Sequence, residues 1–429
     1  MKVSLHTIGC KVNFAETSQI REKFESLGYE ITDFGKPSDV ILLNTCTVTS
    51  KADADARKLI RRAKRKNPGA FIGVMGCYAQ MKPEEISNIE GVSAIFGQKE
   101  KAYVPDLINN IIGKEKTQTE VSCTDNIPFD FATTYDNESR TRGFMKLQDG
   151  CDYFCSFCTI PYARGSSRSM PFESIPGQFD KIAENGYNEV VISGINLGTY
   201  KAKTGENFTD VVNLIDKTRH PVRVRISSIE PNLLNDEIID IVAGSNVFCP
   251  HFHIPLQSGS DEILRKMKRR YKSGYYRELI HKIKHKMPDC GIGVDVIVGF
   301  PGETDEHFMQ TYELLESLPV SYLHVFTYSE REGTKAAEMN NKVPERIRKE
   351  RTIKLRELSE IKKKAFYESQ IGKEKVVIPE TYNKQTGTFD GWTENYVRVS
   401  LKAPENLDKQ PKRVLLKKMN KNKVYAELL

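Results

Sequence analysis

The chain has 429 residues, which is enough for two or three domains with sizeable hydrophobic cores. Hydrophobic residues make up 39% and charged residues 28%, a balance that is typical of folded soluble proteins and excludes a disordered chain. The formal net charge of +7 is compatible with a polyanionic partner. Residues 1–10 lack the apolar core of a signal peptide, and no segment approaches the ~20 apolar residues of a membrane span, so we expect a cytoplasmic protein without membrane contact.

Three apolar segments in the first third of the chain are each predicted to form a short strand that ends at a cysteine. They are residues 3–10, 39–46 and 71–77, which end at Cys10, Cys46 and Cys77. Helical patterns lie between them, as strand–helix–strand units require. Because ligands bind beyond the carboxyl ends of parallel strands, we expect the three thiols to converge on one crevice of an open α/β sheet. The alternative is three independent core cysteines, since free cysteine is often buried.

Residues 114–140 show weak periodicity and many polar side chains, and we interpret them as a linker between domains. Their single cysteine, Cys123, is expected to be inert. The chain has nine cysteines, and in a reducing compartment this number indicates metal or redox chemistry rather than disulfides.

A second set of cysteines stands in the stretch Cys151-Asp-Tyr-Phe-Cys155-Ser-Phe-Cys158, with three thiols inside eight residues. Thiolates so close in sequence can reach one metal centre, and iron–sulfur clusters are held in this way. A structural zinc site needs a fourth ligand, and none is obvious nearby. We therefore predict a four-iron cluster held by three cysteines, with one iron open to a ligand. The other interpretation is a loop with three buried or redox-active cysteines.

Strand and helix signals then alternate to about residue 340, which favours a parallel barrel or partial barrel. The candidate strands are residues 189–193, 222–227, 251–254, 293–298 and 322–326. Chemistry in such barrels lies at the carboxyl ends of the strands. The candidate residues at these ends are Asn196, Glu230, His253, Gln257 and the loop at residues 299–303. Taken singly, His253 is also consistent with a core histidine, and the glycine and proline of the loop with a simple turn.

Basic residues gather in two regions of the second half of the chain. Residues 265–272 carry a cluster of cations, and a long charged helix is predicted from Pro344 to about Gln370. Short strands follow at residues 376–378, 387–389, 395–401, 414–416 and 424–428, which predicts a small antiparallel β-barrel of a kind that often binds RNA. Its cations are Lys409, Lys412, Arg413, Lys417, Lys418, Lys421 and Lys423.

The cysteine spacing of residues 151–158 resembles the signature of radical S-adenosylmethionine enzymes. Together with the three amino-terminal cysteines and the basic terminal barrel, the whole chain resembles the methylthiotransferases of that superfamily. The resemblance implies that Cys151, Cys155 and Cys158 hold a [4Fe-4S] cluster that binds and cleaves S-adenosylmethionine. It also implies that Cys10, Cys46 and Cys77 hold a second [4Fe-4S] cluster, which carries the inserted sulfur. Residues 391–396 resemble part of the family's TRAM domain.

This resemblance implies four segments, each expected from the order of the family's domains. They are an amino-terminal α/β domain at residues 1–118, a linker at 119–137, a partial radical-enzyme (β/α) barrel at 138–366 and a TRAM-like β-barrel at 367–429. The further cofactor contacts that we expect are Asn196, Glu230, His253, Gln257, Asp295 and Glu303. A Gly-Gly-Glu stretch typical of radical enzymes is replaced by residues 193–196, Ser-Gly-Ile-Asn, which leaves the contact to the cofactor's amino group unassigned.

Several short stretches resemble the branch of the family that acts on N6-threonylcarbamoyladenosine in tRNA. They are residues 9–13, 161–165, 194–198, 227–231 and 328–334. The expected activity is methylthiolation of carbon 2 of that base, next to the anticodon. The other substrates of the family are isopentenyladenosine in tRNA and an aspartate of a ribosomal protein. A non-enzymatic iron–sulfur RNA-binding protein is the remaining alternative.

The partners that this reaction implies are a tRNA anticodon stem-loop, an external electron donor and a sulfur donor whose identity the sequence does not give. Carbon 2 of adenine carries an unactivated C–H bond that no side-chain acid or base can ionise, so a radical-generating cofactor must act on it. The target adenine must be flipped out or exposed in a loop, because the chemistry cannot reach a stacked base.

Overall fold

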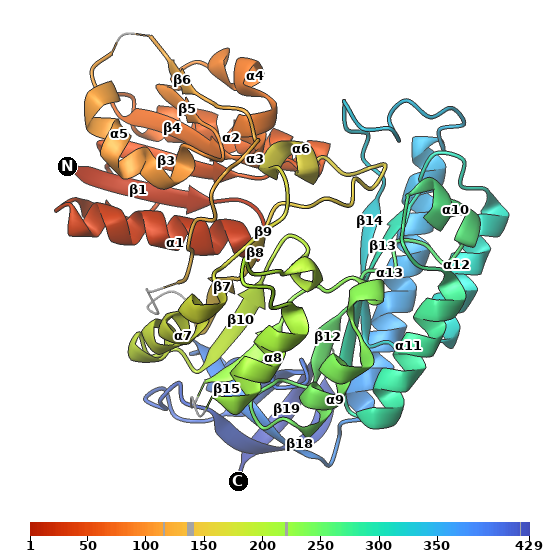
Figure 1. Cartoon of the computed structure of the whole chain (residues 1–429). Coiled ribbons are helices and arrows are strands. Elements are labelled where there is room, and N and C mark those ends of the chain that lie inside the picture. The colour runs from red at the N-terminus through yellow and green to blue at the C-terminus, as the bar shows by residue number, and fades with distance from the viewer. Residues whose placement is uncertain (115, 135–140, 219–221, 421) are drawn as a thin grey trace.

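The structure is a computed structural model that describes residues 1–114, 116–134, 141–218, 222–420 and 422–429. Three modules follow one another along the chain, and the first and last lie at opposite ends of the central one (Figure 1). The first is an α/β domain in red and orange, and the last is a small β-barrel in dark blue. Among the described helices, none is long and apolar enough to cross a membrane.

The α/β domain is built on a six-stranded sheet in the order β2-β1-β3-β4-β5-β6, in which all neighbouring strands are parallel. Its strands are β1 (Lys2–Thr7), β2 (Glu30–Thr32), β3 (Val40–Thr45), β4 (Phe71–Gly76), β5 (Ala94–Phe96) and β6 (Gln118–Glu120). Its helices are α1 (Lys11–Ser26), α2 (Ser50–Lys66), α3 (Cys77–Met81), α4 (Pro83–Ser87) and α5 (Val104–Ile111). β3 and β4 are buried along their whole length because helices cover both faces of the sheet.

The three strands that the sequence predicts before a cysteine are confirmed as β1, β3 and β4. The sequence does not predict β2, β5 and β6, because three residues are too few for a periodic pattern. β6 ends at Glu120, so the sheet extends past the domain boundary expected at residue 118. The boundary expected at residue 137 falls within residues 135–140, which lie outside the described part of the chain.

The central module is a partial barrel of six parallel strands. Sheet β11-β10-β7 and sheet β12-β13-β14 are joined by a bridge between Ser228 and His253. The strands are β7 (Arg142–Lys146), β10 (Glu189–Ser193), β11 (Arg223–Ile226), β12 (His251–His253), β13 (Gly291–Val298) and β14 (Tyr322–Thr327). The outer helices include α7 (Ile175–Glu184), α8 (Phe208–Lys217), α9 (Asp236–Gly244), α11 (Ser273–Lys286), α12 (Asp305–Ser317) and α13 (Glu345–Glu368). The predicted partial barrel is therefore confirmed. The sequence does not predict β7, because Arg142 and Lys146 interrupt its apolar pattern.

Alternate residues of these strands point to opposite sides. Met145, Ile192 and Val294 belong to the core that the strands share with the outer helices. On each strand, the residues that alternate with these core residues point to the opposite side, which we call the inner face. Its members used below are Arg142, Phe144, Lys146, Glu189, Val191, Arg225, His251, His253, Asp295, Tyr322 and His324.

The terminal module is a closed barrel in the order β15-β16-β17-β19-β18. Its strands are β15 (Glu374–Asn383), β16 (Thr388–Thr393), β17 (Arg398–Lys402), β18 (Lys412–Asn420) and β19 (Lys423–Leu428). The expected small antiparallel β-barrel is confirmed: four of its five strand pairs are antiparallel, and β19 closes the barrel by running parallel to β17. Closure removes the free strand edges that would otherwise pair with other chains.

Arginines of the central module hold the terminal barrel in place. Arg223 donates to the carbonyl oxygens of Val376 at 2.9 Å and Trp392 at 3.1 Å. Arg225 donates to the carbonyl of Glu394 at 2.9 Å. The terminal barrel therefore docks where β11 begins, and it leaves the carboxyl ends of the central strands free.

Candidate functional site

The first cysteine set lies in the loop between β8 (Gln148–Asp149) and the short helix α6 (Ile160–Arg164), at the carboxyl end of the first barrel strand. The backbone N–H of Cys158 donates to the carbonyl of Cys155 at 3.0 Å, which curls the loop around its own thiols. Burial, together with the nearby thiols of Cys155 and Cys151, raises the pKa of Cys158 to about 12. These thiols stay protonated at neutral pH unless a metal replaces the proton.

Hydrogen-bond donors are directed at two of these sulfur atoms. Nη1 of Arg269 lies 3.1 Å from Sγ of Cys155, and Nδ2 of Asn196 lies 3.8 Å from Sγ of Cys151. Arg269 is held by an ion pair with Glu230. Donors to sulfur stabilise metal-bound thiolates, so the three cysteines and their neighbours fit an iron–sulfur cluster.

Several side-chain oxygens near the carboxyl ends of the barrel strands are buried without a partner among the described residues. Two of them are amide oxygens, Oδ1 of Asn196 and Oε1 of Gln257. Gln257 also has a positive φ of 65°, which is uncommon for a residue with a Cβ. Buried acceptors without a donor are costly unless a ligand supplies one. Both residues therefore fit a ligand with N–H groups, such as the ammonium group of S-adenosylmethionine.

Replacing Arg269 with glutamine is expected to shift the reduction potential of a cluster at Cys155 to a more negative value, because a cation that stabilises the reduced cluster is removed. Loss of a charged hydrogen bond worth ~1.5 kcal/mol corresponds to about 60 mV for a one-electron couple. A redox titration followed by electron paramagnetic resonance measures the shift. Arg270→Gln is the matched control, because Arg270 stacks on the ring of Tyr153 at 3.7 Å. Equal potentials in the two variants would contradict the role of Arg269.

The structure brings the predicted residues His253 and Asp295 together with His324, which the sequence did not single out. Nε2 of His253 and Nδ1 of His324 lie 3.1 and 3.2 Å from Oδ1 of Asp295, on the inner face. Burial alone would raise the pKa of Asp295, but its hydrogen bonds to the two histidines lower it far below the usual value. His324 follows from the register that places it beside Asp295 on adjacent strands, and no local motif marks it.

Glu303 does not join this group. Its carboxylate accepts from the backbone N–H of Gly299 at 2.9 Å and from Arg351 at 2.5 Å. Burial raises the pKa of Glu303, and the two donors oppose that rise. Glu303 thus fixes the loop at residues 299–303, because its carboxylate contacts both the backbone of that loop and Arg351 of α13. Glu230 is likewise paired, with Arg269.

The second cysteine set lies at the carboxyl edge of the α/β sheet. Cys10 precedes α1, Cys46 follows β3 and Cys77 begins α3. A Cβ on Gly9, which has a φ of 139°, would lie 3.0 Å from Cβ of Cys46, so glycine allows the first two strand ends to approach. Burial, together with the thiols of Cys77 and Cys10, raises the pKa of Cys46 to about 12.

Donors also surround Cys77. Its Sγ accepts from Nε of Arg164 and from Nε2 of Gln98, both at 3.3 Å. Burial raises the pKa of Cys77 even though Arg164 and Lys101 oppose the rise. A thiolate at this position would be stabilised by one cation and one amide, so the second set also fits a metal cluster.

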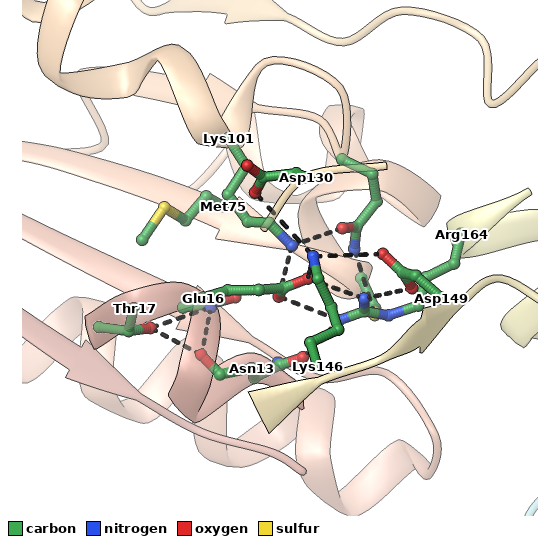
Figure 2. Close-up of polar contacts among 12 residues, drawn as sticks. Asn13, Glu16, Thr17, Met75, Lys101, Asp130, Lys146, Asp149 and Arg164 are labelled. Atoms are coloured by element: carbon green, nitrogen blue, oxygen red, sulfur yellow. Dashed lines mark hydrogen bonds and ion pairs between the residues drawn. The ribbon is translucent and has the colours of Figure 1, made fainter. Parts of the chain in front are cut away.

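Arg164 connects the two cysteine sets. It lies at the end of α6, which begins two residues after Cys158, and its side chain is completely buried. Besides Cys77, the guanidinium donates to Glu16 at 3.0 Å and to Asp149 at 2.8 Å (Figure 2). Residues 161–165 resemble a stretch of the family, but nothing in that stretch predicts the contact between Arg164 and Cys77.

Two lysines complete this buried network, as Figure 2 shows. Lys101 and Lys146 lie 2.6 and 3.3 Å from the carboxylate of Glu16. Burial alone would raise the pKa of Glu16, but Arg164 and the two lysines hold it well below its usual value. Because Glu16 and Lys101 come from the α/β domain and the others from the central module, the network fixes the two modules to each other.

Comparisons with known proteins agree with this architecture. A family model described as an uncharacterized protein family, UPF0004, matches residues 2–97, and the model of the radical SAM superfamily matches residues 145–315. Solved structures share the fold. A radical S-adenosylmethionine methyltransferase, TsrM, from Kitasatospora setae superposes with a TM-score of 0.55 at 15% identity, covering 78% of this chain and 77% of that one.

Relatives of similar length carry more specific names. The threonylcarbamoyladenosine tRNA methylthiotransferase of Bacillus subtilis is 40% identical, over 94% of this chain and 91% of its own. The protein of the same name from Aquifex aeolicus is 36% identical, over 95% and 98%. The tRNA-2-methylthio-N(6)-dimethylallyladenosine synthase of Fusobacterium nucleatum is 34% identical, over 88% and 87%. The chain therefore belongs to the radical S-adenosylmethionine methylthiotransferase family, in the branch of the threonylcarbamoyladenosine tRNA methylthiotransferases.

Proposed function

We propose that this enzyme adds a methylthio group to carbon 2 of N6-threonylcarbamoyladenosine next to the anticodon of tRNA. The observation that carries the proposal is the pair of cysteine sets linked by Arg164, which follows Cys158 by a short helix and donates to Cys77. A reaction that must both break a C–H bond and insert sulfur needs two such centres side by side. The names of the relatives from Bacillus subtilis and Aquifex aeolicus support this substrate.

The two centres have different tasks in this proposal. Cys151, Cys155 and Cys158 hold a [4Fe-4S] cluster, which together with bound S-adenosylmethionine supplies the radical chemistry for an unactivated C–H bond. Asn196 and Gln257 bind the cofactor through their unpaired amide oxygens.

The inner face and the second cysteine set complete the site in this proposal. His253 and Asp295 line the inner face beside the cofactor. Glu230 and Glu303 act indirectly, by positioning Arg269 and the loop at residues 299–303. Cys10, Cys46 and Cys77 hold the second [4Fe-4S] cluster, which carries the sulfur.

The tRNA partner binds through its phosphates in this proposal. The terminal barrel carries cations whose ion pairs lie at the surface, such as Arg413 with Glu374 and Lys417 with Glu427. Surface ion pairs are worth little in water, so these cations can turn to phosphates at small cost. Lys421, which we counted with them, lies outside the described residues. The reaction also needs an external electron donor and a sulfur donor. The enzyme acts on its tRNA in the cytoplasm.

Deleting the gene is expected to remove 2-methylthio-N6-threonylcarbamoyladenosine from cellular tRNA and to leave N6-threonylcarbamoyladenosine in its place. Mass spectrometry of tRNA nucleosides measures both. A plasmid copy of the gene restores the product, whereas a copy with Cys151→Ser does not. An unchanged amount of the methylthiolated nucleoside in the deletion strain would overturn the proposed substrate.

Isopentenyladenosine in tRNA is the second candidate substrate, because relatives named for dimethylallyladenosine are 33–34% identical to this chain. The same nucleoside measurement separates the two, since each product has its own mass. A loss confined to the methylthio derivative of isopentenyladenosine would favour this candidate. If neither nucleoside changes, the aspartate of a ribosomal protein becomes the substrate to test, by mass spectrometry of ribosomal proteins.

A further inference from the structure

Lys11 is a cation beside the second cysteine set, at the first residue of α1. Residues three and four apart share one side of a helix, so Lys11 lies on the side of Phe14 and Ala15. The ring of Phe14 lies 6.4 Å from that of Phe144, and Ala15 packs in one cluster with Phe144 and Val191. Since these barrel residues belong to the inner face, Lys11 lies over the inner face, next to Cys10 in sequence.

Lys11 has no hydrogen bond or ion pair among the residues that the structure describes. The cations of the inner face are paired: Arg142 lies 3.2 Å from Glu380, and Arg225 lies 2.9 Å from Glu189. Each of these arginines therefore already has its anion.

Lys11 is exposed to solvent at the first residue of α1, so an anionic ligand can reach it. A lysine ammonium pairs with a carboxylate through a charge-assisted hydrogen bond.

We propose that Lys11 forms a carboxylate-binding subsite that receives the threonyl carboxylate of the substrate base. This inference rests on the proposed function and names the residue that reads its substrate. Carbon 2 and the N6 substituent belong to the same, base-pairing edge of adenine. A base whose carbon 2 faces the sulfur centre at Cys10 therefore presents its N6 substituent to the neighbouring side chain. An isopentenyl group carries no charge, so Lys11 favours the threonylcarbamoyl base over the isopentenyl base.

The test compares two anticodon stem-loops, one with N6-threonylcarbamoyladenosine and one in which the threonyl carboxylate is a neutral amide. Wild-type enzyme is expected to bind the carboxylate form about tenfold more tightly, as a charged hydrogen bond predicts. Lys11→Gln loses that preference, and Lys11→Arg keeps it. Lys2→Gln, which removes a surface partner of Glu30 at the opposite end of β1, is the matched control and keeps it as well. Fluorescence anisotropy gives the affinities without turnover, and KM rather than kcat carries the loss.

Three results would overturn the subsite. If wild-type enzyme modifies the carboxylate stem-loop but Lys11→Gln retains the preference for it, another residue reads the group. If Arg270→Gln rather than Lys11→Gln abolishes the preference, the reader is the cation near the first cluster. If wild-type enzyme binds both stem-loops equally, no cation recognises the carboxylate. This result is measured on the wild-type enzyme and does not depend on how well the variants fold. Failure of wild-type enzyme to methylthiolate the carboxylate stem-loop at all would instead refute the proposed function.

Discussion

Alanine in place of Cys151, Cys155 or Cys158 is expected to abolish reductive cleavage of S-adenosylmethionine and, with it, all methylthiolated product. Each of these thiols is a ligand in the proposed cluster. Loss of a residue that only supports a ligand already costs about 10–100-fold, so loss of a ligand should cost at least about 100-fold. Release of 5′-deoxyadenosine, measured by liquid chromatography after anaerobic reconstitution, reports the cleavage, and iron content reports the lost cluster.

Alanine in place of Cys10, Cys46 or Cys77 is expected to give a different pattern. Cleavage of S-adenosylmethionine continues, because the first cluster and its neighbours Arg269 and Asn196 are intact, but sulfur insertion stops. Cys123→Ala is the control, since Cys123 is exposed and outside both sets. If the second group of variants lost cleavage as completely as the first while remaining folded, the proposed division of labour would be wrong.

Replacing Arg164 with methionine is expected to lower the free energy of unfolding by about 3 kcal/mol, the lower end of the cost of breaking a buried ion pair, because Glu16 keeps Lys101 and Lys146 and Asp149 keeps Arg168 as partners. The change keeps most of the side-chain volume but leaves Glu16 and Asp149 facing each other without the guanidinium between them. Cys77 also loses a donor, so the second cluster should be released more easily. Anaerobic urea denaturation measures the stability, and iron content after gel filtration measures the retention of the cluster.

The matched control for this change is Arg346→Met, which removes a surface ion pair with Glu350 one helical turn away. Exposed pairs of this kind contribute ~0.5 kcal/mol or less, so the control should unfold like the wild type. Similar stabilities for the Arg164 and Arg346 variants would contradict the view that the buried network joins the two modules. Normal stability with early loss of iron would limit the role of Arg164 to its contact with Cys77.

The agreement between sequence and structure is best where the signal is local. The strands before Cys10, Cys46 and Cys77 were predictable because each is a short apolar run followed by a helix, and parallel sheets impose that order. The terminal barrel was predictable from strands separated by turn residues, but not the parallel pairing of β17 with β19. Pairing direction depends on how the chain closes the barrel, which no single segment encodes.

By itself, the amino-acid sequence determined the family, the order of the modules and the two cysteine sets, because those features depend on spacing within short stretches. Only the tertiary structure decided which side chains serve them. Arg164 meets Glu16 across 148 residues of chain, and Arg269 meets Cys155 across 114. Lys11, which lies over the inner face, lacks a partner in the described structure, whereas Arg142 and Arg225 are paired. Such contacts arise when separate modules pack together and buried charges must find partners, and no local pattern records them.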